Sequence, residues 1–275
     1  MLITYDYTNE GVGAQYLRVI NLIALCKIHN YTYLYNQIKI GHNYNNDSKW
    51  DLKWDNFFNI KSFIPDNYDK FKHLPVINIK ILEESFLNEH KNENNIYSIN
   101  IPFKITNNII YYNSIKNDII EAFKNNNYIP KNNYFDKNKF NIAIHIRVFN
   151  NCDDEHQEDD YNNSRYRFEF SENDYFIIIR KIQLLYPDGI IHIFSQKLIY
   201  RKFNNLCNLP NIQFHIDCDT FETFYHLTKA NLLIIAKSAF SHLAGYYNEN
   251  TVVYLGYDNM PLNDWINIHT FLNIS

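Results

Sequence analysis

Residues 142–151 have the sequence IAIHIRVFNN, and they decide the fold that we expect for this chain. Every second residue of the segment is branched and aliphatic: Ile142, Ile144, Ile146 and Val148. This period of two predicts a strand with a buried face. His145 and Arg147 fall on the opposite face, where two side chains that can carry positive charge need an anion, a partner or an open edge of a sheet.

Strands and helices alternate from this segment to the end of the chain. The expected strands are 141–148, 190–194, 212–216, 232–236 and 251–255, the last of the chain. Helices are expected to start near Ser171, after Gln196, near Thr220 and near Ser238. The first of them has Asp174 in a capping-box position and ends near Leu185. Such alternation is typical of a parallel, doubly wound sheet, whose ligands bind at the carboxyl ends of the strands. His145 and Arg147 lie at such an end.

The N-terminal half begins with a similar pattern. Residues 2–5 and 31–35 are expected strands, joined by a loop from Thr8 to Gly13 and a helix that ends at about His29. The apolar face of this helix contains Leu17, Ile20, Ala24 and Ile28. Residues 40–138 have only a weak pattern, apart from a helix expected at 114–124. The polar segment 125–140 contains a proline and separates two expected α/β lobes, 1–135 and 139–275.

Composition excludes several functions. The chain has 275 residues, is 46% hydrophobic and carries a net charge of −4, so it lacks the basic footprint of a nucleic-acid-binding protein. Its 4 cysteines form no CxxC pair, which argues against a zinc site. No secretory signal and no apolar run of membrane length are visible. We therefore expect a soluble, cytoplasmic protein without a membrane span.

Three short motifs each allow a structural and a functional interpretation. Gly11 and Gly13 either shape a tight turn or open a helix N-terminus to a phosphate. His145 and Arg147 either join a salt bridge or clamp a diphosphate, because a guanidinium matches phosphate bidentately. Ser238 is an expected helix N-cap, and the free backbone N–H groups beyond it can also face phosphate.

Two acidic motifs favour the structural interpretation. Asp217 and Asp219 form a DxD triplet of the kind that holds a metal in many glycosyltransferases, but Asp219 with Glu222 also predicts a capping box for the next helix. The run Asp153–Asp160 predicts a solvated loop, although a general base can lie within it.

The motifs together resemble the fucosyltransferase superfamily, and most closely its α1,2-fucosyltransferase-like group, which is related to the α1,6- and protein-O-fucosyltransferases. The likeness rests on the GVGAQ loop at 11–15, the HIRV segment at 145–148, the IFSQK strand end at 193–197 and the ungapped segment ETFYHLTKANLLIIAKSAFSHLAGYYN at 222–248. The chain departs from the family pattern at four positions: Ala14, Val148, Gln196 and Lys197.

This resemblance implies an α/β fold of the GT-B type, with two Rossmann-like lobes and a crevice between them. It implies an inverting, metal-independent glycosyltransferase that moves fucose or a related sugar from a GDP-sugar to a glycan or glycoconjugate hydroxyl. Lobe 1–135 would be the acceptor side and lobe 139–275 the nucleotide-sugar donor side. A non-catalytic nucleotide-sugar or glycan-binding protein of the same fold, and a metal-dependent DxD glycosyltransferase, stay open as alternatives.

The resemblance also implies roles for single residues. Arg147 would contact the diphosphate and stabilise the leaving GDP, and His145 would line the nucleotide side of the pocket. Glu10 would be the general base, because protein-O-fucosyltransferases of one type place a glutamate before this loop. The remaining donor contacts would be the loop glycines, the phosphate-facing turn and an acid at the guanine edge: Gly11, Gly13, Ser238, Phe240, Ser241, and Glu222 or Asp219.

Overall fold

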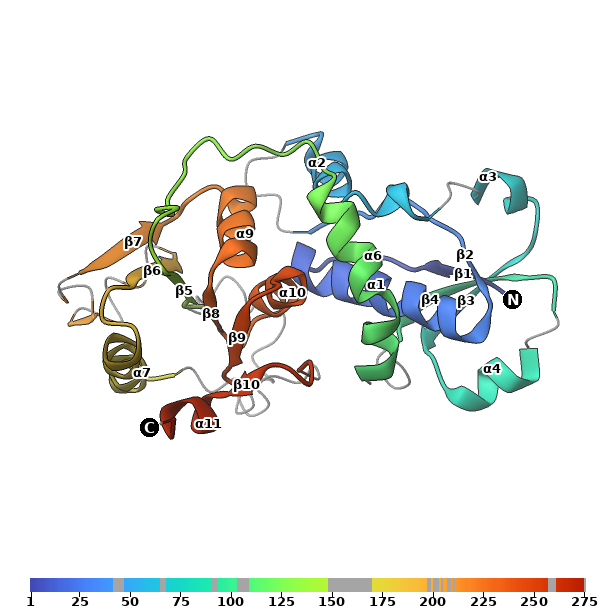
Figure 1. Cartoon of the computed structure of the whole chain (residues 1–275). Helices are drawn as coiled ribbons and strands as arrows, with labels where there is room; N and C mark the ends of the chain where they lie inside the picture. The colour runs from blue at the N-terminus through green and yellow to red at the C-terminus, as the bar shows by residue number, and fades with distance from the viewer. Residues whose placement is uncertain are drawn as a thin grey trace, which may run out of the picture. The chain divides into compact units, whose positions relative to one another are not determined.

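A computed structural model describes residues 1–41, 47–64, 68–90, 93–102, 109–147, 170–196, 199, 203, 205–206, 209, 211–256 and 261–274. The chain divides into two units, Met1–Ile129 and Pro130–Ser275 (Figure 1). The division falls inside the polar segment 125–140.

The first unit is built on a parallel sheet with the strand order β2-β1-β4-β3. Its strands are β1 Leu2–Tyr5, β2 Thr32–Tyr33, β3 Val76–Ile81 and β4 Ile96–Ile101. Its helices are α1 Val12–His29, α2 Trp50–Phe58, α3 Tyr68–Phe71, α4 Glu84–His90 and α6 Ile109–Lys124, with a 3₁₀ turn at Ile60–Ser62. The expected strand at 31–35 is shorter than predicted, and α6 starts five residues before the helix expected at 114–124.

Helix α1 is the central helix of this unit, and its residues from Tyr16 to Cys26 are all buried. A helix that is apolar on nearly every side must be covered on nearly every side, and α1 packs against both β1 and α6. Leu17, Ile20 and Ala24 are buried as predicted, whereas Ile28 is 40% exposed because it lies in the last turn, before the left-handed C-cap Asn30.

The second unit contains a parallel sheet with the strand order β10-β9-β8-β5-β6-β7. Its strands are β5 Asn141–His145, β6 Ile190–Ser195, β7 Ile212–Ile216, β8 Leu232–Ile235, β9 Thr251–Tyr254 and β10 Ile266–Asn267. Its helices are α7 Glu172–Leu185, α9 Thr220–Lys229, α10 Ala239–Tyr247 and α11 Ile268–Leu272. The α/β fold with parallel sheets is thus confirmed. The prediction that 251–255 is the last strand is wrong, because two later residues pair with β9.

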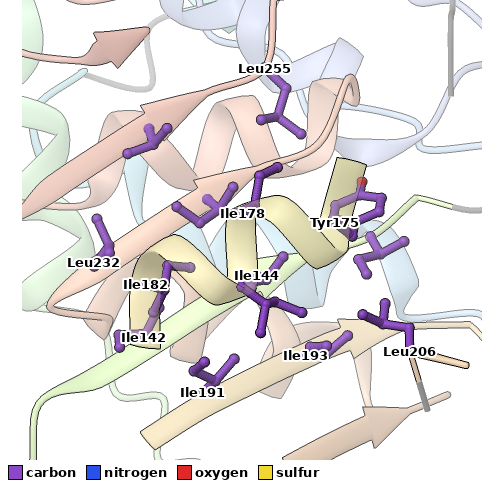
Figure 2. Close-up of a cluster of buried hydrophobic side chains, with 14 of the residues drawn as sticks. Ile142, Ile144, Tyr175, Ile178, Ile182, Ile191, Ile193, Leu206, Leu232 and Leu255 are labelled. Atoms are coloured by element: carbon purple, nitrogen blue, oxygen red, sulfur yellow. The ribbon is translucent and has the colours of Figure 1, made fainter. Parts of the chain in front are cut away.

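The two faces of this sheet are covered by different helices. Ile142 and Ile144 of β5 contribute to a hydrophobic core with Tyr175, Ile178 and Ile182 of α7 (Figure 2). The capping box predicted at the start of α7 is present, since Ser171 and Asp174 exchange side-chain and backbone hydrogen bonds. Helices α9 and α10 pack against each other and contact β5 and β8 respectively.

The strand order reverses beside β5. The chain runs from β5 outward through β6 to β7 and then returns to β8 on the other side of β5. In an open parallel sheet, this reversal leaves room at the carboxyl ends of the two central strands, which is where ligands bind. The topology therefore directs attention to the ends of β5 and β8.

Candidate functional site

His145 is the last residue of β5, on the face opposite the hydrophobic core around Ile144. Its side chain is buried, with 8% of the residue exposed, and its ring lies 5.8 Å from that of Phe240 on α10. Within the described part of the chain, the Nδ1 atom of His145 has no hydrogen-bond partner. A buried polar atom without a partner is costly, so it marks a position where a ligand atom or a water is needed.

Burial and the nearby charge of Arg147 lower the pKa of His145 to about 3. The ring is therefore neutral at pH 7. A neutral imidazole has one N–H donor and one acceptor nitrogen, so Nδ1 can exchange a hydrogen bond with a ligand without carrying charge.

Arg147 follows β5 and is half-buried. Its Nη1 atom donates a hydrogen bond of 2.9 Å to Oε1 of Gln196, which follows β6. The neighbouring strand ends are joined as well, because Ser195 donates from Oγ to the backbone oxygen of Ile146 at 2.8 Å. Gln196 is neutral, so this bond orients the guanidinium without neutralising it.

Helix α10 begins directly after β8. Ser238 occupies the N-cap position, as expected, but its side chain makes no capping hydrogen bond, so that part of the prediction is wrong. The first bond of the helix runs from His242 N to Ser238 O at 2.9 Å. The backbone N–H groups of residues 239–241 precede it and point out of the helix end, where they and the helix dipole favour an anion.

These features meet at the topological reversal. The ring contact joins β5 to the first turn of α10 through His145 and Phe240, and Phe240 is fixed from behind by Phe224 of α9 at 5.4 Å. The Ser241 hydroxyl donates to the backbone oxygens of Ala236 and Ser238, at 3.3 and 3.4 Å, and so fixes the turn rather than facing outward. The site thus combines a guanidinium, a helix N-terminus and an unsatisfied neutral imidazole.

The two predicted acids of α9 have different roles. Asp219 caps the helix, because its Oδ1 accepts hydrogen bonds from the backbone N–H groups of Phe221 and Glu222 at 2.9 and 3.1 Å. Glu222 does not complete a capping box. Its Oε1 accepts from the backbone N–H groups of Lys131 and Asn132, at 2.9 and 3.0 Å.

The second oxygen of Glu222 is occupied as well. Oε2 accepts from Asn132 Nδ2 at 2.9 Å and from the Tyr134 hydroxyl at 3.2 Å. Burial alone would raise the pKa of Glu222, but the hydrogen bonds from Asn132, Tyr134 and Lys131 together hold it below its ordinary value. The ionised carboxylate anchors the start of the second unit, and its proposed role at a guanine edge stays a prediction.

Three histidines adjoin this anchor, and sequence reasoning missed them. His192 Nδ1 lies 3.0 Å from His215 Nε2, and His226 Nε2 accepts from the backbone N–H of Tyr134 at 3.2 Å. Burial is the main cause that lowers the pKa of His192 to about 3 and of His215 to about 4, with a further contribution from neighbouring histidines. Their spacing in the sequence gives no signal, because strand pairing and a helix bring them together.

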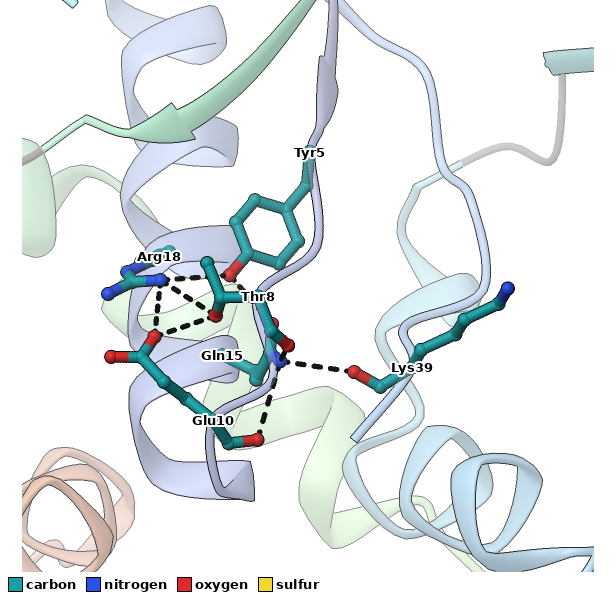
Figure 3. A network of polar contacts seen from close by, with 6 residues as sticks. All are labelled: Tyr5, Thr8, Glu10, Gln15, Arg18 and Lys39. Atoms are coloured by element: carbon teal, nitrogen blue, oxygen red, sulfur yellow. Dashed lines mark hydrogen bonds and ion pairs between the residues drawn. The ribbon is translucent and has the colours of Figure 1, made fainter. Parts of the chain in front are cut away.

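In the first unit, Glu10 belongs to a polar network at the start of α1 (Figure 3). Its Oε2 atom forms an ion pair with Arg18 and accepts a hydrogen bond of 2.7 Å from the Thr8 hydroxyl. Arg18 also donates to Thr8 Oγ1 at 2.9 Å. The Glu10 side chain is 44% exposed and that of Arg18 only 10%. The buried Arg18 therefore holds the carboxylate of Glu10, which is partly exposed at the surface.

The glycine loop is shorter than predicted. Gly11 is the N-cap of α1, with an extended backbone, but Gly13 lies inside the helix and is buried. Gln15 fixes the loop, because its Nε2 donates to the backbone oxygens of Thr8 and Lys39, the latter at 3.1 Å, while its Oε1 accepts from the Tyr5 hydroxyl at 2.7 Å. Arg18 was also missed, although a lone arginine within the apolar run YLRVINLIAL is a visible signal.

Some predicted features lie outside the described residues: Val148, the acidic run Asp153–Asp160, Lys197 and the helix expected after Gln196. In the part of the chain that is described, no helix is long and apolar enough to cross a membrane. The same part contains no group of three or more His, Cys, Asp or Glu side chains arranged to hold a metal ion.

Comparison with known proteins identifies a similar fold. No protein-family model and no curated sequence matches the chain. Among solved structures, the chain is similar to the crystal structure of POFUT1, a GDP-fucose protein O-fucosyltransferase, in complex with GDP. The TM-score is 0.51 and the sequence identity 10%, over 93% of this chain and 98% of POFUT1. The similarity shows a GT-B-like α/β fold.

Proposed function

We propose that this protein is an inverting glycosyltransferase that uses GDP-fucose, or a related GDP-sugar, and transfers the sugar to a hydroxyl of a glycan or glycoconjugate. The observation that carries the proposal is the unsatisfied Nδ1 of His145 at the carboxyl end of β5, with Arg147 two residues after it and the first turn of α10 in contact with its ring through Phe240. Similarity of the fold to POFUT1 in complex with GDP supports the choice of nucleotide.

The cluster has the chemistry that a leaving nucleoside diphosphate requires. A guanidinium provides two N–H groups in one plane for two phosphate oxygens, and the helix N-terminus provides backbone N–H groups and a favourable dipole. Negative charge grows on the diphosphate as the bond to the sugar breaks, so donors that are already in place stabilise the transition state more than the ground state. In our proposal this role belongs to Arg147 and to the backbone N–H groups of the first turn of α10, which follows the N-cap Ser238 and includes Phe240 and Ser241.

In the proposed reaction, the acceptor oxygen attacks the anomeric carbon from the side opposite the diphosphate. The new carbon–oxygen bond forms as the carbon–oxygen bond to GDP breaks, and the acceptor proton passes to a base. Glu10 suits this role because its Oε2 atom is held by Arg18 and Thr8, whereas Oε1 has no hydrogen bond or ion pair to another described residue. A base oriented by a second group is a common catalytic arrangement.

The reaction that we propose needs no metal. Asp219, the second acid of the DxD triplet, already caps α9 through two backbone N–H groups. Asp217 has a left-handed backbone with φ of 50°, as is usual in a tight turn. These structural roles favour the capping interpretation of the triplet over metal binding.

The test is calorimetric titration with GDP and UDP, followed by incubation with GDP-fucose in the presence of EDTA. We expect heat of binding for GDP and not for UDP, and release of GDP from the sugar that EDTA does not abolish. A response to UDP alone would contradict the donor assignment. Loss of turnover with EDTA would favour the metal-dependent mechanism instead.

A second function is a binding protein without catalysis, and the ion pair between Glu10 and Arg18 favours it. In such a protein Glu10 would serve only as the structural partner of the buried Arg18. Binding of GDP in the calorimeter, combined with no release of GDP from GDP-fucose over a panel of glycan acceptors, would select this function.

A further inference from the structure

Strand β3 forms one edge of the sheet in the first unit. It pairs with β4 in parallel, from Val76 opposite Ile96 to Ile81 opposite Ile101. Within the described residues, no other strand lies on its second side, since the order of the sheet ends with β3. The outer backbone N–H and C=O groups of such a strand can pair with another strand.

This strand is exposed to an unusual degree for its composition. Its sequence VINIKI is rich in β-branched residues, yet five of the six residues are exposed and only Ile79 is half-buried. Val76 is 48% exposed, Ile77 37% and Ile81 49%. Edge strands are normally protected by charge, proline or a covering element, and Lys80 is the only charge within β3. An apolar edge of this kind indicates a partner.

Charges of opposite sign lie before and after the strand. Lys70 and Lys72 precede β3, and Glu83 and Glu84 follow it; all four are exposed. Lys72 also contacts Asp69 at 3.4 Å, but both side chains are more than half exposed, and such a pair contributes little. Lys70 lies in α3 and Glu84 in α4, so these charges flank β3 rather than lie within it. With Asp69 and Lys80 also counted, the segment before β3 stays net basic and the segment at its end net acidic.

We propose that β3 pairs antiparallel with β3 of a second copy of this chain, about a two-fold axis through Ile79. An antiparallel arrangement brings the basic start of one strand to the acidic end of the other, twice, whereas a parallel arrangement would bring like charges together. A closed two-fold interface of this kind is the commonest one in homo-oligomers.

The register follows from the alternation of side chains. Ile77, Ile79 and Ile81 share one face of β3, so a two-fold axis at Ile79 sets Ile77 opposite Ile81 of the partner subunit and joins the two apolar stripes into one. Apolar pairs directly opposite each other stabilise antiparallel strands. Shifting the pairing by one residue would instead face isoleucines with Asn78 and Lys80.

The pairing buries one short strand on each side, which is less than a permanent dimer requires. We therefore expect a dimer that forms reversibly as the protein concentration rises and weakens as salt screens the terminal charges. Sedimentation velocity over a range of concentrations measures this directly, at low and at high salt.

Ile81→Lys tests the apolar stripe, and Leu52→Lys on α2 is its matched control because Leu52 is 44% exposed in the same unit. We expect Ile81→Lys to weaken dimerisation at least about tenfold, which is about 1.4 kcal/mol, and Leu52→Lys to leave it unchanged. A wild-type chain that stays monomeric at every concentration, or equal behaviour of the two variants, would overturn the proposal.

Charge reversal tests the orientation. Glu83→Lys with Glu84→Lys should weaken the dimer, and adding Lys70→Glu with Lys72→Glu should restore it. A folding defect caused by the first pair would not be repaired by the second pair, so recovery separates the interface from stability. Failure of the fourfold variant to recover, with its circular dichroism unchanged, would contradict the antiparallel arrangement.

Discussion

The Glu10 carboxylate and the Arg18 guanidinium form an ion pair at the start of α1 through one carboxylate oxygen, Oε2, which also accepts a hydrogen bond from Thr8 (Figure 3). Arg18 is mostly buried and Glu10 is half-exposed. The pair therefore fixes the direction of the carboxylate and leaves its other oxygen toward the surface. In the proposed reaction, this ion pair orients the carboxylate of Glu10.

Replacing Glu10 tests its proposed role as the general base. Glu10→Gln keeps the shape but removes the base, so we expect turnover with an acceptor to fall about 10²–10³-fold, within the range for general-base catalysis. The Kd for GDP should not change, because the diphosphate is assigned to the second unit. Glu121→Gln, at an exposed position on α6, is the control. Unchanged turnover in Glu10→Gln would remove Glu10 as the base and favour the binding function.

Acid should destabilise the second unit through its buried histidines. The pKa values of His145 and His192 fall to about 3 in the folded protein, against about 6.5 when unfolded. The unfolded chain thus binds more protons between these values, so stability is complete above about pH 6.5 and is lost as the pH falls toward 3. Each such histidine contributes up to about 1.4 kcal/mol per pH unit in this window.

Urea unfolding at pH 7 and pH 5, followed by circular dichroism, measures the effect. His192→Gln should reduce the slope of the free energy of unfolding against pH by an amount close to the binding of one proton, because a neutral amide replaces the titrating ring. If the free energy of unfolding is the same at both pH values, the folded protein takes up as many protons between pH 7 and pH 5 as the unfolded chain does. That result would contradict the lowered pKa values.

Gly245 allows α10 to lie close to Trp265. A Cβ atom at this position would come within 2.8 Å of Cη2 and Cζ2 of the indole, which is itself packed on His242 and Tyr246. Overpacking costs about 1–3 kcal/mol, which exceeds the gain of about 1 kcal/mol from alanine in a helix. Gly245→Ala should therefore lower the free energy of unfolding by about 1 kcal/mol.

A double-mutant cycle identifies the cause. In a Trp265→Phe background the smaller ring leaves room, so Gly245→Ala should cost less there than in the wild type. Equal costs in the two backgrounds would show that the indole is not the obstacle. Melting curves of the four proteins give the comparison.

The sequence predicts the second unit better than the first, because its signals are local. Ser171 and Asp174, which lie within four residues, predict the start of α7. The alternation of side chains in β5 predicts which face of that strand is buried. Strand β3 does carry an alternation, at Ile77, Ile79 and Ile81, but it is short and lies in a segment with only a weak pattern. Its exposure follows from its place at the edge of the sheet, which no local signal predicts. β10 is only two residues long, which is too short for any period to be visible.

The site divides in the same way. The place of His145 and Arg147 at the end of a strand could be predicted, because the alternation of β5 is visible in the sequence. The partners of Glu222 were not, because Lys131 lies 91 residues away and offers only a backbone N–H group, which every residue but proline has. The environment of Glu10 was missed because Arg18 reaches it only when α1 is folded.

The most direct test of the account is calorimetric GDP binding by wild type and by Arg147→Ala, with Arg180→Ala, an exposed arginine on α7, as the control. Among the contacts of Arg147, the hydrogen bond to Gln196 contributes about 1 kcal/mol to stability, and the melting temperature of each variant is measured beside its GDP binding. We expect Arg147→Ala to lose GDP affinity and about 10²–10³-fold of its turnover, while Arg180→Ala retains both. Unchanged GDP binding in Arg147→Ala, together with a large fall in its melting temperature, would contradict the account and make Arg147 a structural residue.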